Sequence, residues 1–130
     1  MTTATIEFEI EKSVEEVWNV ITDLQQYEWR SDILQIKILD DKTFIEVSKD
    51  DIETTFTITS FEVGKRYAFD IDNKNMKGHW IGLFEKTNKG TKVIFEEQVE
   101  VKHAIMKLFV KKFLTKQQTT YVDDLRNVWK

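Results

Sequence analysis

The chain begins with a regular alternation of polar and apolar side chains. In the segment 5–11 the apolar residues Ile6, Phe8 and Ile10 occupy every second position. A period of two is typical of a strand with one buried face and one solvated face. The pattern therefore predicts an N-terminal strand over residues 5–11.

Directly after this strand the period becomes that of a helix. Ser13 and Glu16 have the Ser-x-x-Glu spacing of a capping box, in which each side chain satisfies a free backbone N–H at a helix start. Apolar residues then recur at three- and four-residue spacing: Val14, Val17, Trp18, Ile21 and Leu24. We predict a helix of about ten residues whose apolar stripe needs a partner.

The middle of the chain is rich in β-formers. Runs of Ile, Val, Phe, Thr and Trp cover residues 33–39, 43–48, 52–61, 65–72, 76–86 and 91–101. The gaps between them are short and carry Asp, Asn, Lys and Gly, which suit tight turns. Consecutive strands should therefore pair as an antiparallel meander, because a parallel sheet would need crossover helices.

The last segment, 104–129, returns to helical spacing. Its apolar residues share one predicted face: Met106, Val110, Phe113, Leu114, Tyr121, Leu125 and Val128. Lysines lie beside this face, and they form either a solvated surface or one that touches anionic lipid headgroups. We expect one long amphipathic helix here. Residues 103–130 hold six Lys/Arg against two Asp/Glu, so this helix should attract the acidic remainder of the chain.

Composition narrows the class of protein. With 130 residues, 41% of them hydrophobic, the chain is expected to form a single domain over residues 1–130. The absence of cysteine removes disulfides, thiolate metal sites and cysteine nucleophiles. A net charge of −4 argues against nucleic acid as a partner. The sequence has no long apolar run and no basic leader, so we expect a cytoplasmic protein without stable membrane insertion.

Seven strands and one long apolar helix have few ways to bury both hydrophobic surfaces. Curling the sheet around the helix is the most economical arrangement. A curled sheet cannot meet a straight helix along its full length, and the space between them is a natural site for a small ligand.

This arrangement resembles the START-like superfamily (SRPBCC, polyketide cyclase/dehydrase). The resemblance is carried by Ser13–Trp18, Asp23, Tyr27–Trp29, Gly78–Glu85, Asn88–Val93 and Val99–Lys102. It implies an α+β helix-grip fold, a curved seven-stranded antiparallel sheet wrapped around the C-terminal helix. Two positions depart from the family pattern, since Val14 and His103-Ala104 stand where relatives often have proline and Asn-Pro. The resemblance specifies a fold rather than a reaction, because its members include lipid carriers, receptors and cyclases.

The pairing register of the strands at 76–86 and 91–101 determines which polar side chains face the cavity. A three-residue turn, Asn88-Lys89-Gly90, would place Glu97 on the concave side diagonal to His79. A slip of one residue would instead bring Trp80 inward, opposite Glu97. We favour the first register. A carboxyl on the concave side would be partly desolvated, with its pKa pushed upward unless it is paired.

The C-terminal helix offers further polar groups. Gln117 interrupts its apolar face, with Tyr121 one turn later, and a buried amide needs a hydrogen-bond partner in the cavity or on the sheet. The ligand-binding candidates are therefore these two residues, His79, Glu97 and five aromatic residues: Trp29, Phe56, Tyr67, Phe69 and Phe113.

We expect the protein to bind or transport a hydrophobic small molecule, such as a lipid, a polyketide or an aromatic metabolite. A cyclase- or dehydratase-like enzyme using His79 with Glu97 or Tyr121 is one alternative, and a protein-interaction module is another. No nucleophile motif or phosphate loop is present, so no catalytic residue is assigned. Two isolated histidines without cysteine predict no metal, no cofactor is expected, and the chain should be a monomer or weak homodimer.

Overall fold

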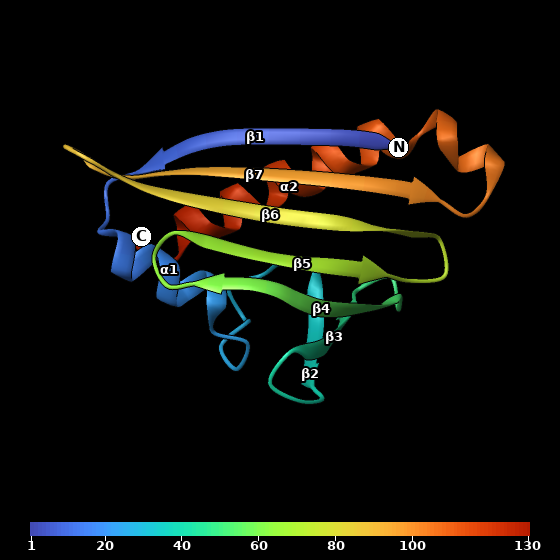
Figure 1. Ribbon diagram of the computed structural model, residues 1–130, viewed down its shortest axis with the longest axis horizontal. Coiled ribbons are helices and arrows are strands. Elements are labelled where there is room, and N and C mark those ends of the chain that lie inside the picture. The colour runs from blue at the N-terminus through green and yellow to red at the C-terminus, as the bar shows by residue number, and fades with distance from the viewer.

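The computed structural model describes all 130 residues. The elements are β1 (Thr2–Ile10), α1 (Val14–Thr22), β2 (Ile33–Ile38), β3 (Thr43–Ser48), β4 (Glu53–Glu62), β5 (Arg66–Asp72), β6 (Met76–Thr87), β7 (Gly90–Val101), the 3₁₀ helix η1 (Ala104–Leu108) and α2 (Val110–Asn127) (Figure 1). The strands form one antiparallel sheet in the order β1-β7-β6-β5-β4-β3-β2. The predicted meander and the α+β helix-grip fold are thus confirmed.

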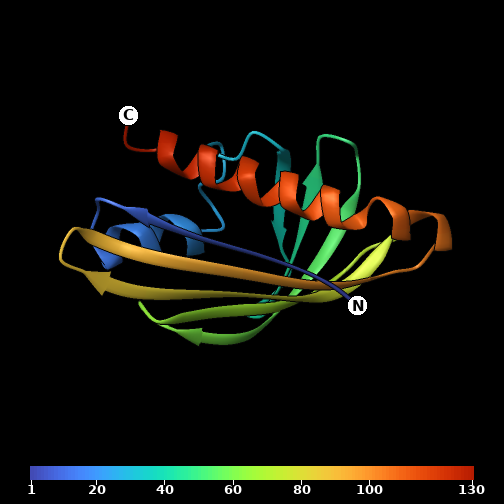
Figure 2. The same cartoon turned by 90° about the horizontal axis from the view of Figure 1, so that it is seen from above.

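The sheet curves around α2. Figure 2 shows α2 running along the concave side while β2, β3 and β4 rise toward it. β1 pairs with β7 and so brings the N-terminus beneath the same helix. The curvature leaves space between the sheet, α2 and the segment 23–32, which connects α1 to β2. No helix has both the length and the apolar character needed to cross a membrane.

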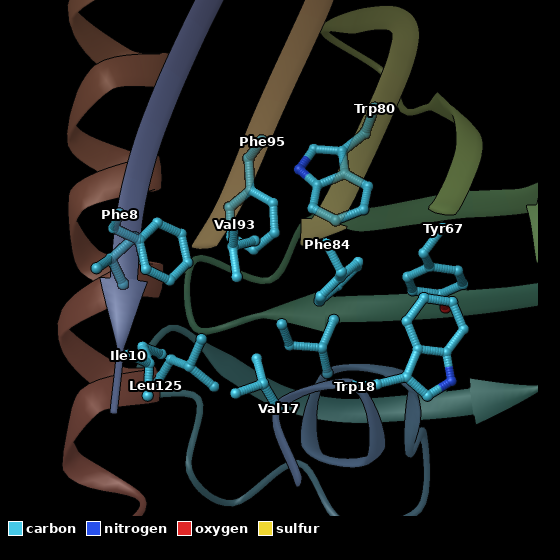
Figure 3. Packing of buried hydrophobic residues seen from close by; sticks show 12 residues of the cluster. Phe8, Ile10, Val17, Trp18, Tyr67, Trp80, Phe84, Val93, Phe95 and Leu125 are labelled. Carbon is cyan, nitrogen blue, oxygen red and sulfur yellow. The ribbon is translucent and has the colours of Figure 1, made fainter. Parts of the chain in front are cut away.

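The predicted capping box starts α1. The Ser13 hydroxyl accepts a hydrogen bond from the Glu16 N–H at 3.1 Å, and the Glu16 carboxylate accepts one from the Ser13 N–H at 3.1 Å. Val17 and Trp18 are buried on the inner face of the helix. Figure 3 shows the Trp18 indole reaching Phe84 and Tyr67 on the sheet, so the apolar stripe of α1 finds its partner there.

The C-terminal helix differs from the prediction in two respects. It is broken at Phe109, where η1 ends and α2 begins. The buried face of α2 consists of Val110, Leu114, Gln118, Val122, Asp124 and Leu125. Phe113 is 49% exposed, so the expectation that it lies on the apolar face is wrong. The buried face steps mainly by four residues, which rotates Phe113 away from the sheet.

The β6–β7 hairpin has a two-residue turn. Thr87 pairs with Gly90, not with Thr91, so only Asn88 and Lys89 form the loop. Gly90 has a φ of 148°, and a side chain there would meet the Ile10 carbonyl oxygen at 2.3 Å. Glycine at this position therefore allows β1 and the turn to approach closely, and the hairpin takes the alternative register.

Candidate functional site

A cavity of about 90 Å³ lies between the concave face of the sheet, the segment 23–32 and α2. Its sheet wall is mostly aromatic: Phe44, Phe56, Tyr67, Phe69, Trp80 and Phe95. Polar side chains reach it from four elements of the fold: Arg30, Glu46, Glu97, Gln117, Gln118 and Tyr121. The cavity thus combines an apolar wall with a few polar groups, as small-molecule sites commonly do.

The aromatic wall is packed as one continuous layer. Trp80 stacks on Phe69 with ring centroids 4.6 Å apart, and Phe69 meets the edge of Phe56 at 4.9 Å. Phe56 in turn stacks on Phe44 at 4.8 Å. Because each ring packs against the next, the four side chains form one continuous apolar surface.

Glu97 is the most unusual polar group in the cavity. It pairs with Ala4 on β1 and with Trp80 on β6, which places it on the concave face. The residue is 8% exposed, and its Oε1 atom has no hydrogen-bond partner. Burial, together with the charge of Glu46, raises the pKa of the Glu97 carboxyl to about 7. Both protonation states are therefore accessible near neutral pH.

A buried cation lies on the other side of the cavity. The Arg30 guanidinium is 3.5 Å from the Glu46 carboxylate and 3.4 Å from that of Asp32, and it lies over the Tyr121 ring at 4.5 Å. Burial alone would lower the pKa of Arg30, but its carboxylate neighbours outweigh this effect and raise it. Burial also raises the pKa of Glu46, more than Arg30 lowers it. Arg30 is thus a fixed positive charge beside the cavity.

The segment 23–32 covers the cavity and is tied to α2. The Trp29 ring meets the Tyr121 ring edge-on, with centroids 5.2 Å apart. The Asp124 carboxylate accepts hydrogen bonds from both the N–H and the hydroxyl of Ser31, each at 2.8 Å. These contacts hold the segment 23–32 against α2 along one side of the cavity.

Seven of the nine predicted site residues line this cavity: Trp29, Phe56, Tyr67, Phe69, Glu97, Gln117 and Tyr121. The structure brings them together, and their contact with a ligand remains a prediction. Phe113 lies outside, on the exposed side of α2.

His79 also lies outside the cavity, and its predicted inward orientation is wrong. The two-residue turn pairs it with Gln98 and places it on the convex face, where its Nδ1 contacts the Asp70 carboxylate. Trp80 takes the inward position instead and is 9% exposed. The predicted couple between His79 and Glu97 therefore does not form, because the two side chains lie on opposite faces of the sheet.

The buried amide of α2 belongs to Gln118 rather than to Gln117. The Gln118 Nε2 donates a hydrogen bond to the Ala4 carbonyl at 2.9 Å, so this side chain fastens the helix to β1. Gln117 is exposed on one side and reaches the rim of the cavity. Gln117 is thus free to contact a ligand, whereas Gln118 has a structural partner.

Sequence reasoning missed Arg30 and Glu46. Glu46 lies two residues after Phe44 on β3. Because residues two apart on a strand share a face, this spacing could have placed Glu46 on the concave face with Phe44. Arg30 lies in a segment without regular structure, and no sequence pattern indicates that its side chain turns inward to meet β3.

A family model and several solved structures match this chain over nearly its whole length. Residues 1–129 match the family model described as polyketide cyclase/dehydrase and lipid transport. A START superfamily protein from Mycobacterium smegmatis aligns with a TM-score of 0.84 at 14% identity, over 97% of this chain and 94% of its own. Protein MLL2253 from Mesorhizobium loti aligns with a TM-score of 0.82 at 12% identity, over 98% and 96% of the two chains.

A third similar structure is DynU16, a protein of the dynemicin biosynthetic locus. It aligns with a TM-score of 0.77 at 11% identity, over 96% of this chain and 46% of its own. At such identities these likenesses concern the fold alone. A search of curated proteins finds no significant match.

Proposed function

Because the chain belongs to the polyketide cyclase/dehydrase and lipid transport family, we propose that it binds a small hydrophobic molecule with one polar group in the cavity between sheet and α2. The aromatic wall would contact the apolar part of the ligand, and burial of that part would supply most of the affinity, at about 25 cal/mol per Å². Glu97 would hold the polar group.

The unpartnered Oε1 of Glu97 is the observation that carries this proposal. A buried carboxyl oxygen without a hydrogen bond is costly, and its cost is removed when a bound molecule supplies the missing partner. A protonated Glu97 would donate to a carbonyl or ether oxygen, and an ionised Glu97 would accept from a hydroxyl, amide or amine. The ligand is therefore an apolar molecule with an oxygen or nitrogen function at one end.

The size of the cavity adds a second condition. Its volume of about 90 Å³ is below the roughly 150 Å³ of a cavity known to hold benzene. A ligand larger than a few heavy atoms therefore requires the segment 23–32 to move outward. Trp29 and the Ser31–Asp124 contact are the points at which this movement would begin.

Native mass spectrometry of the purified protein, followed by thermal denaturation with a library of lipids and oxygenated aromatic compounds, tests the proposal. A ligand at a hundredfold excess over its Kd should stabilise the fold by about 2.7 kcal/mol. The gain should be smaller in Glu97→Gln, which keeps the shape but cannot ionise. No co-purifying mass and no stabilisation across the library would contradict the proposal.

Catalysis in the same cavity is the second candidate, and the pKa of Glu97 favours it. A carboxyl group that titrates at about pH 7 inside an apolar site can give a proton to a bound substrate or take one from it. Such a cyclase- or dehydratase-like activity would follow a pH profile with an inflection near that value. Loss of the inflection in Glu97→Gln would support this role, and unchanged turnover would exclude it.

A further inference from the structure

Four large apolar side chains are exposed within residues 105–113, where the sheet passes into the C-terminal helix. Ile105 is 72% exposed, Leu108 81%, Phe109 63% and Phe113 49%. We call these four residues the apolar corner. Residues three apart in a 3₁₀ helix lie one above the other, so Ile105 and Leu108 share a face of η1. Phe109 and Phe113 are one turn apart and share a face of α2.

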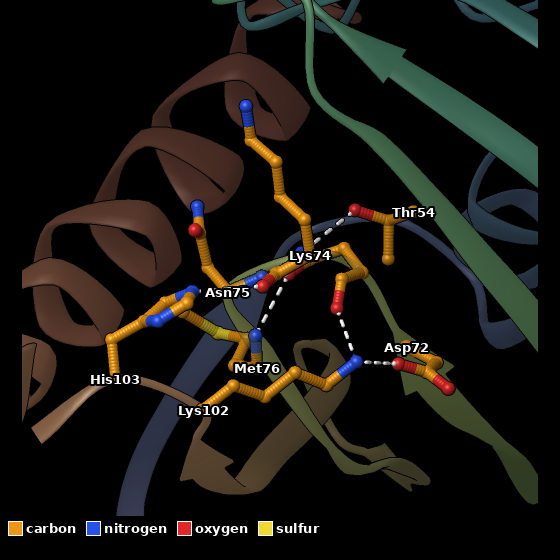
Figure 4. Close-up of polar contacts among 8 residues, drawn as sticks. Thr54, Asp72, Lys74, Asn75, Met76, Lys102 and His103 are labelled. Atoms are coloured by element: carbon orange, nitrogen blue, oxygen red, sulfur yellow. Dashed lines mark hydrogen bonds and ion pairs between the residues drawn. The ribbon is translucent and has the colours of Figure 1, made fainter.

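The apolar corner projects from the body of the protein. Figures 1 and 2 both show η1 extending past the end of the sheet before the chain turns back into α2. Its base is held firmly, as Figure 4 shows, because Lys102 donates to the Asp72 carboxylate and to the Asn73 carbonyl, each at 2.6 Å. The side chain of His103 lies 3.2 Å from the Lys74 carbonyl. The corner is therefore a supported protrusion rather than a loose end.

Positive charge is concentrated in the same segment, although the chain as a whole carries −4. Residues 103–116 contain four lysines and neither Asp nor Glu: Lys107, Lys111, Lys112 and Lys116. None of these lysines forms an ion pair, and only Lys111 has a contact, with the Thr3 carbonyl. Lys112 and Lys116 alternate with Phe109 and Phe113 on the solvent face of α2, at i, i+3, i+4 and i+7.

We propose that the apolar corner docks on an anionic lipid bilayer, with its side chains entering the headgroup region and the lysines binding acidic headgroups. Large exposed apolar side chains rimmed by lysine are the composition of helices that lie in a membrane interface. A protruding corner can bring its apolar side chains into the headgroup region while the lysines beside it stay at the charged surface. A second copy is disfavoured, since two such corners would bring like charges together.

This docking is independent of ligand binding in the cavity, although the two sites are close along α2. Phe113 belongs to the corner, and Gln117, one turn later, lines the rim of the cavity. A hydrophobic molecule taken from a bilayer would therefore have a short path between the two.

Because the chain has no cysteine, a single labelled residue can report insertion without a background signal. We would label Leu108→Cys with the environment-sensitive dye NBD and add vesicles of phosphatidylcholine with about 30 mol% phosphatidylserine in about 0.1 M salt. Val63→Cys is the control, because Val63 is also 72% exposed but lies in the β4–β5 turn. We expect dye at residue 108 to brighten and shift to the blue, and dye at residue 63 to stay unchanged.

Vesicle flotation of unlabelled variants separates the two contributions. Leu108→Ser with Phe109→Ser should abolish binding, whereas Val63→Ser should not change it. Lys107→Gln, Lys112→Gln and Lys116→Gln together should weaken binding by about a hundredfold, since each lysine near an anionic surface contributes roughly fivefold. The matched control removes three other exposed lysines, Lys49, Lys77 and Lys86, and should change binding much less.

Four results would overturn the proposal. The first is no binding to the anionic vesicles. The second is binding without a change in the dye at residue 108. The third is equally strong binding to soluble polyglutamate, which would indicate an acidic protein as the partner. The fourth is a concentration-dependent dimer without vesicles that Leu108→Ser disrupts, which would show that the corner pairs with a second copy.

Discussion

The Asp124 carboxylate on α2 accepts two hydrogen bonds from Ser31, one from its N–H and one from its hydroxyl, each at 2.8 Å. This contact joins the segment that covers the cavity to the helix that bounds it. Because the segment has no regular secondary structure of its own, its position depends on such contacts.

Asp124→Ala should make the segment 23–32, which lies over the cavity, more mobile. It removes two hydrogen bonds to a charged group, and we expect a loss of about 2 kcal/mol in the free energy of unfolding. Amide exchange should accelerate in residues 24–32 and not in β6 or β7. Asp123→Ala, one residue away and exposed, is the matched control and should change stability by less than about 0.5 kcal/mol. Uniform acceleration across the sheet would contradict a local role.

Glu97 should make the fold less stable as the pH rises. Its pKa is about 7 in the folded protein and near 4.5 in the unfolded chain, so between these values the folded state holds more protons. The contribution of Glu97 to the free energy of unfolding is therefore most favourable below pH 4.5. It falls by roughly 3 kcal/mol as the pH rises from 4.5 through 7. Denaturant unfolding of wild type and Glu97→Gln across this range measures the difference. Parallel pH profiles would mean that the carboxyl is not desolvated.

Gln117 and Gln118 should differ sharply, although they are neighbours. Gln118→Ala leaves the buried Ala4 carbonyl without its partner and should cost about 1–3 kcal/mol of stability. Gln117→Ala should change stability by less than about 0.5 kcal/mol and should alter ligand affinity instead. Chemical denaturation and ligand titration of the two variants test this separation. An equal loss of stability in both would contradict it.

The hairpin register gives a similar contrast at His79 and Trp80. Trp80→Ala removes a buried indole stacked on Phe69 and should cost about 3–5 kcal/mol. His79→Ala breaks an exposed pair with Asp70 and should cost no more than about 1 kcal/mol. Any ligand identified should bind His79→Ala as tightly as wild type. A strong effect of His79→Ala on binding would show that it reaches the cavity.

The helices and strands of this fold can be predicted from the sequence, because each follows the hydrophobic periodicity of its own type. The capping box at Ser13 and the alternation of Ile6, Phe8 and Ile10 locate α1 and β1 from local pattern alone. It was harder to predict which side chains point toward the cavity, because a shift of one residue in a turn or along a helix changes the answer. A turn of two residues instead of three exchanges His79 for Trp80, and one step along α2 exchanges Gln117 for Gln118.

The charged part of the site was beyond sequence reasoning for a different reason. Arg30 meets Glu46 only because an irregular segment folds back over the curved sheet. No local spacing encodes that meeting, since it arises from the tertiary fold. The aromatic wall was easier to anticipate, because Phe56, Tyr67 and Phe69 lie at regular positions on strands with one apolar face.

Titration with the neutral fluorescent probe N-phenyl-1-naphthylamine tests cavity binding most directly. Ile36 lines the cavity from β2, and Ile38, two residues further on the same strand, is 50% exposed and outside it. Wild type and Ile38→Trp should bind the probe with a rise in fluorescence, while Ile36→Trp should fill the cavity and weaken binding at least about tenfold, or 1.4 kcal/mol. Equal affinity in the two tryptophan variants, or no binding by wild type, would contradict a ligand site between the sheet and α2.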